Sequence, residues 1–219
     1  MTDNRSAYNA AIYDDHIINV LPYYHEFHKQ IIDLIRATGR KEIDWLDTGC
    51  GTGSLAAKVL EARDDVRFTL CDPSEPMLNE AKEKLNGKAI RFFHMSSQDL
   101  SFDAEFDVVT AVQSHHYLHP EEREDAVRKC HRALRESGIF VAFENIRLST
   151  DESDAIGLER WLHFLREHGE DAEMHRERRN TTVFPITIEQ HLDLLHRCGF
   201  RSVDVLWTSY LQAGFWAIK

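Results

Sequence analysis

The chain has 219 residues, of which 42% are hydrophobic, so it is long enough for one domain with a full core. Its net charge of −11 argues against a broad basic face, and direct nucleic-acid binding is not expected. The first four residues are polar, no stretch approaches the ~20 apolar residues of a membrane span, and four scattered cysteines form no C-x-x-C pair, so we expect a cytoplasmic protein without membrane association.

The predicted elements begin with residues 14–36, which read as one or two helices broken at Pro22. From residue 43 onward, apolar runs typical of strands alternate with helical patterns. The strand-like runs are 43–47, 66–71, 89–94, 106–112 and 138–143, and the helical patterns are 75–85 and 120–135. This alternation predicts a doubly wound α/β fold whose mostly parallel sheet is covered by helices on both faces.

The C-terminal third has a different character. Residues 147–182 are polar and charged, apart from one amphipathic stretch around Trp161. Thr187 and Gln190 have the spacing of a capping box, and the helix that they open is expected to end at Gly199. The last two apolar segments, 202–207 and 214–218, are close enough to pair as an antiparallel hairpin.

The stretch WLDTGCGTGSLA, residues 45–56, carries three glycines within five positions at the end of a predicted strand. Ligands of open α/β sheets bind at this edge, and glycines let the backbone approach them closely. Asp72 ends the next strand, 19 residues after Gly53, where a carboxylate can accept hydrogen bonds from both hydroxyls of a ribose. Loop and carboxylate together indicate an adenosyl cofactor, either a dinucleotide or a methyl donor.

Three details favour the methyl donor. The dinucleotide motif needs G-x-G-x-x-G, but the spacing here is G-x-G-x-G, and Ser54 stands at the position of the third glycine of that motif. Asp47, directly before the loop, would repel a pyrophosphate but would pair with an ammonium group. Gln98 and Asp99 follow the third strand, where they can reach the amino group of an adenine. An ammonium, a sulfonium and an adenosine together describe S-adenosylmethionine.

The segments LDTGCGTG, LCDPSEPML, SSQDL, FDVVTAVQSHHYL and CHRALRESGIFVAFEN resemble, in order and spacing, the motifs of the class I S-adenosylmethionine-dependent methyltransferases. The resemblance covers residues 43–145 and implies a Rossmann-like sheet of seven strands whose last strand is antiparallel. It implies a single methyltransferase domain over residues 1–219. The parts of that domain are a helical cap (1–40), a cofactor-binding core (41–146), an insertion after the fifth strand (147–185) and a C-terminal helix with a hairpin (186–219). The N-terminal helices and the insertion would form a lid.

The predicted cofactor-binding residues share one edge of the sheet. They are Tyr24, Asp47, Gly49, Cys50, Gly51, Thr52, Gly53, Asp72, Pro73, Met77, Gln98, Asp99, Leu100 and Gln113. The resemblance implies that Asp47 and the glycines line the methionine part of the cofactor and Asp72 the ribose. It implies that Met77 and Asp99 lie near the adenine. Capping of the following helices is the alternative role for Asp72 and Asp99.

The flanking segments YDDHIINVLPYYHEF, YLHPEER and HLDLLHRCGFRSVDVLWTSYLQAGFWAIK are similar in arrangement to the bacterial carboxy-S-adenosylmethionine synthases of tRNA wobble-uridine modification. That resemblance implies cofactor contacts from Tyr24 and from an arginine before the C-terminal helix, either Arg178 or Arg179. The synthase family has Ser at the position of Gly51, and Asn after the fourth strand where this chain has Gln113. These departures favour ordinary S-adenosylmethionine.

The segment QSHHYLHP, residues 113–120, follows the fourth strand, where the methyl group of the cofactor is expected to point. Methyl transfer is an in-line displacement, for which an enzyme aligns the nucleophile and excludes water. Gln113 and His115 are the candidates to face cofactor and acceptor, and His115 and His116 are the candidate catalytic residues. A general base at His115 and a histidine that only packs both stay open. The histidines of this loop have no Cys, Asp or Glu at ligand spacing, so no metal site is expected.

The insertion supplies candidate acceptor-binding residues. Arg147, Arg178 and Arg179, together with His115, are expected to bind an acidic acceptor. A charge-mixed helix surface is the alternative, because acidic residues are interleaved with these arginines. Candidates for an aromatic wall are Tyr8, Tyr13, Tyr23, Tyr24 and Trp161, and packing against the sheet edge is the alternative for each.

The sequence therefore predicts an enzyme that transfers a methyl group from S-adenosyl-L-methionine to a small polar or carboxylate-bearing acceptor and releases S-adenosyl-L-homocysteine. The alternative within the enzymes is a carboxy-S-adenosylmethionine synthase or a methyltransferase of tRNA wobble-uridine modification. A non-catalytic S-adenosylmethionine-binding protein is the alternative of another class. A nicotinamide-dependent oxidoreductase is disfavoured by the glycine spacing and by Asp47. The expected partner is a small-molecule acceptor, and a homodimer stays open.

Overall fold

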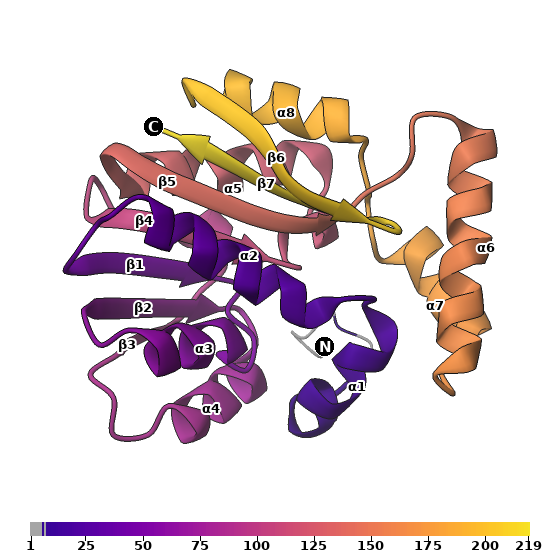
Figure 1. Ribbon diagram of the computed structural model, residues 1–219, viewed down its shortest axis with the longest axis horizontal. Helices are drawn as coiled ribbons and strands as arrows, with labels where there is room; N and C mark the ends of the chain where they lie inside the picture. Colours follow the sequence, from indigo (N-terminus) through magenta and orange to yellow (C-terminus); the bar gives the residue numbers. More distant parts are fainter. Residues whose placement is uncertain (1–5, 7) are drawn as a thin grey trace.

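The computed structural model describes residue 6 and residues 8–219, and the polar residues 1–4 lie outside that part. Its centre is a seven-stranded sheet in the order β3-β2-β1-β4-β5-β7-β6 (Figure 1). The strands are β1 (Ile43–Thr48), β2 (Val66–Asp72), β3 (Arg91–His94), β4 (Phe106–Val112), β5 (Leu134–Asn145), β6 (Ser202–Ser209) and β7 (Gln212–Ile218). Neighbouring strands pair in parallel except at β7, which runs antiparallel to β5 and β6. The predicted fold class and terminal hairpin are confirmed.

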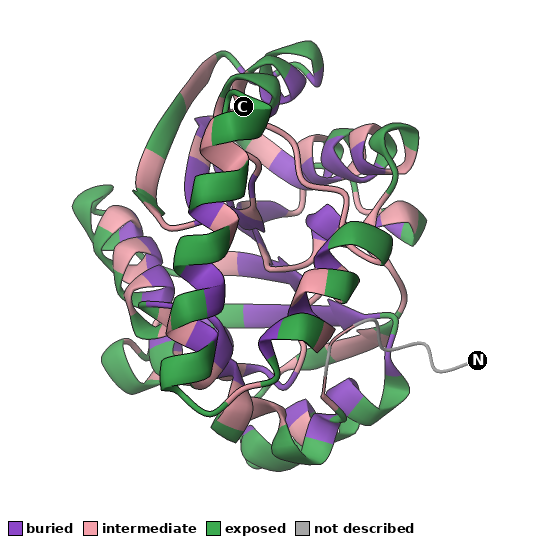
Figure 2. Cartoon of the chain, turned by 90° about the vertical axis from the view of Figure 1, so that its right-hand side faces the viewer, coloured by how far each residue is buried: buried purple, intermediate pink, exposed green. Residues whose placement is uncertain are grey.

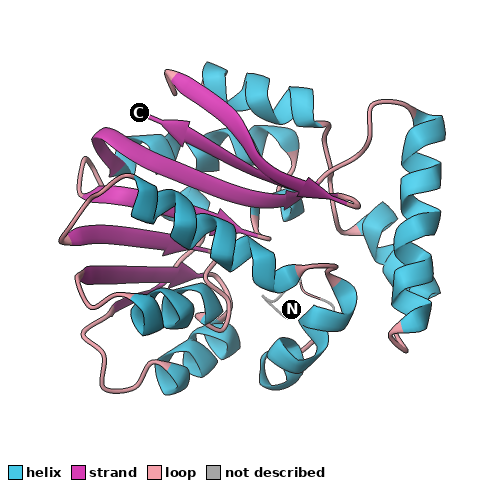
Figure 3. Ribbon diagram, viewed as in Figure 1, coloured by secondary structure: helices cyan, strands magenta, loops and turns pink. Residues whose placement is uncertain are grey.

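Helices cover both faces of this sheet (Figure 3). The helices of the described chain are α1 (Tyr13–Val20), α2 (Tyr24–Ala37), α3 (Ser54–Ala62), α4 (Glu75–Lys84), α5 (Pro120–Ala133), α6 (Asp151–Glu167), α7 (Ala172–Thr181) and α8 (Ile188–Arg197), with the 3₁₀ helices η1 (Ala10–Ile12), η2 (Ser97–Asp99) and η3 (His115–Tyr117). One core cluster joins α2 and α3 to Trp45, and a second joins α5 and α8 to Leu46. Trp45 and Leu46 are adjacent in β1 and both fully buried, as expected for a strand covered on both sides.

The break predicted at Pro22 is present. α1 ends at Val20 and α2 begins at Tyr24, and Tyr23 between them has a left-handed φ of 61°. A proline fixes its own φ and has no amide hydrogen for a continued helix. Because of this turn, α1 lies beyond the carboxyl ends of the parallel strands, while α2 packs along the sheet (Figure 1).

The insertion after β5 contains two helices where the sequence indicated one amphipathic stretch. Side chains cap both of them: Thr150 accepts a hydrogen bond from a backbone N–H of α6, and Asp171 accepts two from α7. The indole Nε1 of Trp161 donates to the carbonyl oxygen of Val20 at 2.8 Å, which ties α6 to the end of α1. The outer side of α6 is exposed, as Figure 2 shows, including Ile156. Helices α1, α6 and α7 thus form one group beside the sheet, and we call this group the lid.

Strand β5 is longer than predicted. It begins at Leu134, because Leu134 pairs with Phe106 ahead of a register shift, and α5 accordingly ends at Ala133. In the described part of the chain, no helix is both long enough and apolar enough to cross a membrane.

Candidate functional site

The glycine-rich loop follows the carboxyl end of β1 and is fixed by its neighbours. The backbone N–H groups of Gly49 and Cys50 donate to the carbonyl oxygen of Cys71 at 2.8 and 3.0 Å. Gly49 has a φ of +69°, and a Cβ there would lie 2.5 Å from the Cβ of Ser114, so only glycine fits. At Gly51 a Cβ would meet no atom within 4 Å. The loop therefore presents bare backbone to the space above it.

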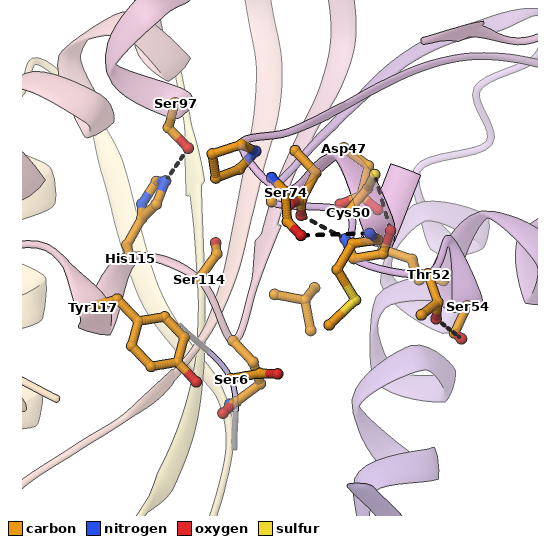
Figure 4. Close-up of a pocket in the computed structure, with 18 of the residues that line it drawn as sticks. Ser6, Asp47, Cys50, Thr52, Ser54, Ser74, Ser97, Ser114, His115 and Tyr117 are labelled. Carbon is orange, nitrogen blue, oxygen red and sulfur yellow. Dashed lines mark hydrogen bonds between the residues drawn. The ribbon is translucent and has the colours of Figure 1, made fainter. Parts of the chain in front are cut away.

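A cavity of about 260 Å³ lies above this loop, and we call it the loop cavity. Its wall comes from the loop, the carboxyl ends of β1, β2 and β4, the helices η2, η3, α1 and α2, and the first turns of α3 and α4. It is lined by Ser6, Tyr13, Tyr24, His28, Asp47, Gly49, Cys50, Gly51, Thr52, Ser54, Leu55, Asp72, Pro73, Ser74, Met77, Ser96, Ser97, Gln98, Val112, Gln113, Ser114, His115, Tyr117 and Leu118. Figure 4 shows Cys50 and Thr52 on one side and His115 and Tyr117 on the other.

Asp72 connects the loop to the end of β2. Its Oδ2 accepts from the backbone N–H of Gly51 and its Oδ1 from that of Ser74, both at 2.8 Å. The N-cap of α4 is Ser74, whose hydroxyl accepts from the backbone N–H of Met77. Asp72 is therefore not the helix cap that the alternative reading assigned to it, and its carboxylate forms part of the cavity wall.

Asp47 lies at the end of β1 and is almost fully buried. Burial and the nearby charge of Asp72 raise its pKa to about 7, although the Thr110 hydroxyl donates to its Oδ1 at 2.7 Å and opposes that rise. No cationic side chain is hydrogen-bonded to this carboxylate in the described residues. An ammonium group in the cavity would therefore stabilise its ionised form.

The residues after β3 divide into two groups. Ser97 and Gln98 line the loop cavity. The carboxylate of Asp99 instead accepts from the backbone N–H and hydroxyl of Ser96, at 3.2 and 2.7 Å, and caps η2 on the surface. Leu100 is buried in the core beneath. The expected adenine contact of Asp99 and the expected cofactor contact of Leu100 are corrected accordingly, because local capping turns Asp99 away from the loop cavity and core packing buries Leu100.

One loop glycine also differs from expectation. Gly53 does not line the cavity, because a Cβ there would face Leu85 and Ala81 of the neighbouring α4 segment. Its role is close packing of the loop against that segment. The remaining predicted cofactor residues, Tyr24, Asp47, Gly49, Cys50, Gly51, Thr52, Asp72, Pro73, Met77, Gln98 and Gln113, all line the loop cavity.

The two candidate catalytic histidines have different surroundings. His115 lines the loop cavity, and its Nε2 lies 2.9 Å from the Ser97 hydroxyl (Figure 4). Burial lowers the pKa of His115 to about 4, so this ring is neutral at pH 7. His116 lines neither this cavity nor the next, because its ring points inward to Glu144 and Asn145. The prediction that His116 contacts an acceptor is therefore corrected: its side chain makes hydrogen bonds inside the protein.

A second cavity of about 70 Å³ lies between the lid and the end of β5, and we call it the lid cavity. It is lined by Ser6, Tyr8, Tyr13, Ile17, Val20, Leu21, Gln113, Tyr117, Asn145, Trp161, His175, Arg178, Arg179 and Val183. Ser6, Tyr13, Gln113 and Tyr117 belong to both cavities. The two spaces therefore adjoin at the segment that follows β4.

The three candidate acceptor-binding arginines separate in space. Arg178 lines the lid cavity and hydrogen-bonds to the Tyr117 side chain. Arg179 also lines it, but its Nη2 donates to the carbonyl oxygen of Ile146 and to Asp154, so it braces the insertion. Arg147 pairs with Asp151 on the surface and lines neither cavity, which corrects its expected role.

The predicted aromatic wall is present in part. Tyr8, Tyr13 and Trp161 line the lid cavity, and Tyr13 and Tyr24 line the loop cavity. Tyr23 does not take part, because it is exposed and its ring packs beside Trp207 and Tyr210.

Sequence reasoning missed several lining residues with polar side chains, among them His28, Ser114, Tyr117, Asn145 and His175. Ser114 and Tyr117 belong to the segment after β4, and Asn145 is the last residue of β5. The rule that ligands bind at the carboxyl ends of strands could therefore have identified these three residues as lining residues. His28 and His175 lie on helices whose position over the cavities no local pattern reveals.

Comparison with known proteins gives one family match and full-length relatives. Residues 46–138 match the family described as a methyltransferase domain. The carboxy-S-adenosyl-L-methionine synthase of Campylobacter lari is 24% identical over 92% of this chain and 88% of its own length. The synthase of Campylobacter concisus is 26% identical over 89% of this chain and 85% of its own. A Bordetella parapertussis protein of known structure has the same fold, with a TM-score of 0.70 and 16% identity over 93% of this chain and 71% of that one.

Proposed function

We propose that the chain is a class I S-adenosylmethionine-dependent methyltransferase and that it methylates a small polar or carboxylate-bearing acceptor held in the lid cavity. In this proposal S-adenosylmethionine occupies the loop cavity and leaves as S-adenosylhomocysteine. Asp47 pairs with the ammonium group of the cofactor and Asp72 accepts from its ribose hydroxyls. Tyr13 and Tyr24 enclose the cofactor from the side of the lid.

The observation that carries the proposal is the junction of the two cavities at Gln113 and Tyr117. An in-line displacement needs the acceptor atom, the methyl carbon and the sulfur on one line, with water excluded. Carboxylates lie on the cofactor side of this junction, at Asp47 and Asp72, and a guanidinium lies on the other side, at Arg178. This charge distribution suits a cationic donor and an anionic or polar acceptor.

A carboxy-S-adenosylmethionine synthase is the second candidate, favoured by the curated relatives that carry this name. In that case Arg178 would pair with a carboxylate carried by the cofactor itself. The segment 182–187, which leads into α8, contains no arginine, so α7 is the nearest source of one. The departures at Gly51 and Gln113 support methyl transfer as the first candidate.

The two candidates differ in their products. We would incubate the purified chain with methyl-labelled S-adenosylmethionine and a set of small carboxylic acids. The set includes hydroxy, amino and phenolic acids as methyl acceptors and readily decarboxylating acids as donors of a carboxyl group. Mass spectrometry of the mixture then detects either S-adenosylhomocysteine with a methylated acid or a carboxylated cofactor. Methylated product supports the proposal, carboxylated cofactor supports the synthase, and binding without either product contradicts both.

A matched pair of variants tests the role of the lid cavity. Arg178→Met removes the guanidinium from the cavity, whereas Arg176→Met makes the same change on the surface of α7, where Arg176 pairs with Glu159 and Glu173. We expect only the first to raise the KM for the acid, by roughly 10-fold or more, since a charged hydrogen bond is worth about 1.5–3 kcal/mol. An equal effect of both variants would contradict acceptor binding at Arg178.

A further inference from the structure

Three amide side chains form a closed hydrogen-bonded ring where the carboxyl ends of β4 and β5 meet the amino end of the antiparallel strand β7. Gln113 Nε2 donates to Gln212 Oε1 at 2.8 Å, and Gln212 Nε2 donates to Asn145 Oδ1 at 2.7 Å. Asn145 Nδ2 closes the ring by donating to Gln113 Oε1 at 3.2 Å. Gln113 lines both cavities and Asn145 the lid cavity, so the ring stands where the two cavities adjoin.

The ring leaves no amide hydrogen for either cavity. An amide nitrogen carries two hydrogens. Those of Gln113 are taken by Gln212 and by the carbonyl oxygen of Phe143, at 3.3 Å. Those of Asn145 are taken by Gln113 and by His116 Nε2, at 3.1 Å. Towards the cavities, both side chains can therefore offer only lone pairs on their oxygens.

A buried hydrogen bond between Glu144 and His116 determines the direction of the amide ring. Burial alone would raise the pKa of Glu144, but the hydrogen bond to His116 and the nearby histidines hold the pKa of its carboxyl below the usual value. An ionised carboxylate only accepts, so His116 Nδ1, at 2.8 Å, carries the hydrogen and His116 Nε2 accepts. The backbone N–H of Asn145 also approaches Nδ1, but at 3.4 Å it is the weaker contact. Asn145 must then turn its Nδ2, and not its Oδ1, towards His116.

The backbone of Gln113 supports the same conclusion. Its φ is +53°, a left-handed conformation that costs energy in a residue with a side chain. Its backbone N–H donates to the carbonyl oxygen of Phe143 at 2.7 Å, and its side chain donates to the same oxygen. The strained conformation is therefore held by bonds that also fix the amide. Strain of this kind concentrates at functional sites.

We propose that Glu144 and His116 are positioning residues that, through Asn145, fix the Gln113 amide so that its oxygen faces the sulfonium of the bound methyl donor. The positive charge and the polarised methyl group of a sulfonium attract a lone pair, whereas the thioether of the product has neither. The ring thus distinguishes S-adenosylmethionine from S-adenosylhomocysteine at the one atom where they differ. This inference rests on the proposed cofactor.

Calorimetry with both ligands tests the proposal on the intact chain without any acceptor. Gln113→Leu keeps the side-chain volume but removes the oxygen, and we expect it to weaken S-adenosylmethionine about tenfold with little effect on S-adenosylhomocysteine. His116→Phe leaves Gln113 in place but removes the acceptor that orients Asn145. This second variant should change the affinity ratio in the same direction, by about threefold. Gln30→Leu on α2, where Gln30 donates a hydrogen bond to Glu26 and lines neither cavity, is the matched control.

The outcomes separate this inference from the proposed function. If the unmodified chain binds neither ligand, the assignment of the cofactor fails. If it binds both and Gln113→Leu weakens both equally, the cofactor stands and the role of the ring is overturned. Should Gln113→Leu fail to fold, as thermal melting would reveal, an unchanged affinity ratio in His116→Phe would overturn it instead.

Discussion

Addition of one methyl group at Gly51 tests whether the glycine-rich loop is the floor of the binding cavity. Gly51 has a φ of +54°, and a Cβ there would meet no atom within 4 Å. In the unliganded protein, Gly51→Ala therefore adds only backbone strain, roughly 1 kcal/mol, which corresponds to a fall in Tm of about 2–4 °C. With the cofactor present, the new methyl group occupies cavity space, and overpacking of roughly 1–3 kcal/mol weakens binding about 5- to 150-fold.

Gly87→Ala is the matched control for this substitution. Gly87 has a φ of +79° and equally open surroundings, but it lies after α4 and lines neither cavity. Both variants should lose a similar amount of stability in thermal melting, and calorimetry should find weaker S-adenosylmethionine binding only in Gly51→Ala. Unchanged affinity in Gly51→Ala would refute the placement of the cofactor against this loop, because the added atom would then have met nothing.

The remaining predictions concern charge, the lid and the loop. The pKa of Asp47 is raised to about 7 in the folded chain, whereas the unfolded chain releases this proton near the ordinary pKa of an aspartate, about 4. The Tm should therefore fall as the pH rises between about 4 and 7, because the folded state binds the proton more tightly. Asp47→Asn should reduce this dependence of the Tm on pH. S-adenosylmethionine needs the ionised carboxylate, so its affinity should fall as pH drops below about 7 in calorimetry, unless Asp47 is replaced. Asp14→Asn should accelerate S-adenosylhomocysteine release several-fold in stopped-flow fluorescence with a stability change under about 1 kcal/mol, because the Asp14–Lys84 pair is partly exposed. Gly49→Ala should destabilise the unliganded chain by about 2–4 kcal/mol in denaturant melts, since left-handed strain adds to a clash with Ser114.

The parts of the site that the sequence predicted are those that depend on local pattern. A run of apolar residues followed by glycines places Gly49 and Gly51 at a strand end, and the next strand end supplies Asp72, because parallel strands bring their carboxyl ends to one edge. Asp99 likewise follows the end of a strand, β3, yet the hydroxyl of Ser96 holds its carboxylate at the surface. That choice depends on a local hydrogen bond of about 1 kcal/mol, which the spacing of motifs does not encode.

The parts that the sequence did not predict depend on contacts between distant segments. Because His115 and His116 are adjacent, the sequence predicts similar roles for them, but Glu144, 28 residues further on, turns the imidazole ring of His116 inward. His175 reaches the lid cavity only because α7 packs beside the N-terminal segment, where its Nε2 lies 3.1 Å from the Tyr8 hydroxyl. Neither contact produces a periodic pattern in the sequence, because each is made by a single residue to an element that is distant along the chain.

The contacts of the N-terminal segment indicate how the enclosed cofactor leaves. On the loop side, Asp14 accepts from the hydroxyls of Thr52 and Ser54, at 2.7 and 3.0 Å, and from Lys84. On the insertion side, Tyr8 donates to Glu170, whose side chain is only 10% exposed, whereas that of Asp14 is 42% exposed. Water competes more effectively for the hydrogen bonds of the exposed Asp14 carboxylate, so these bonds contribute less to holding the lid closed than those of Glu170. We therefore expect α1 to separate first from the loop while it stays attached to the insertion, which opens the loop cavity and leaves the lid cavity covered.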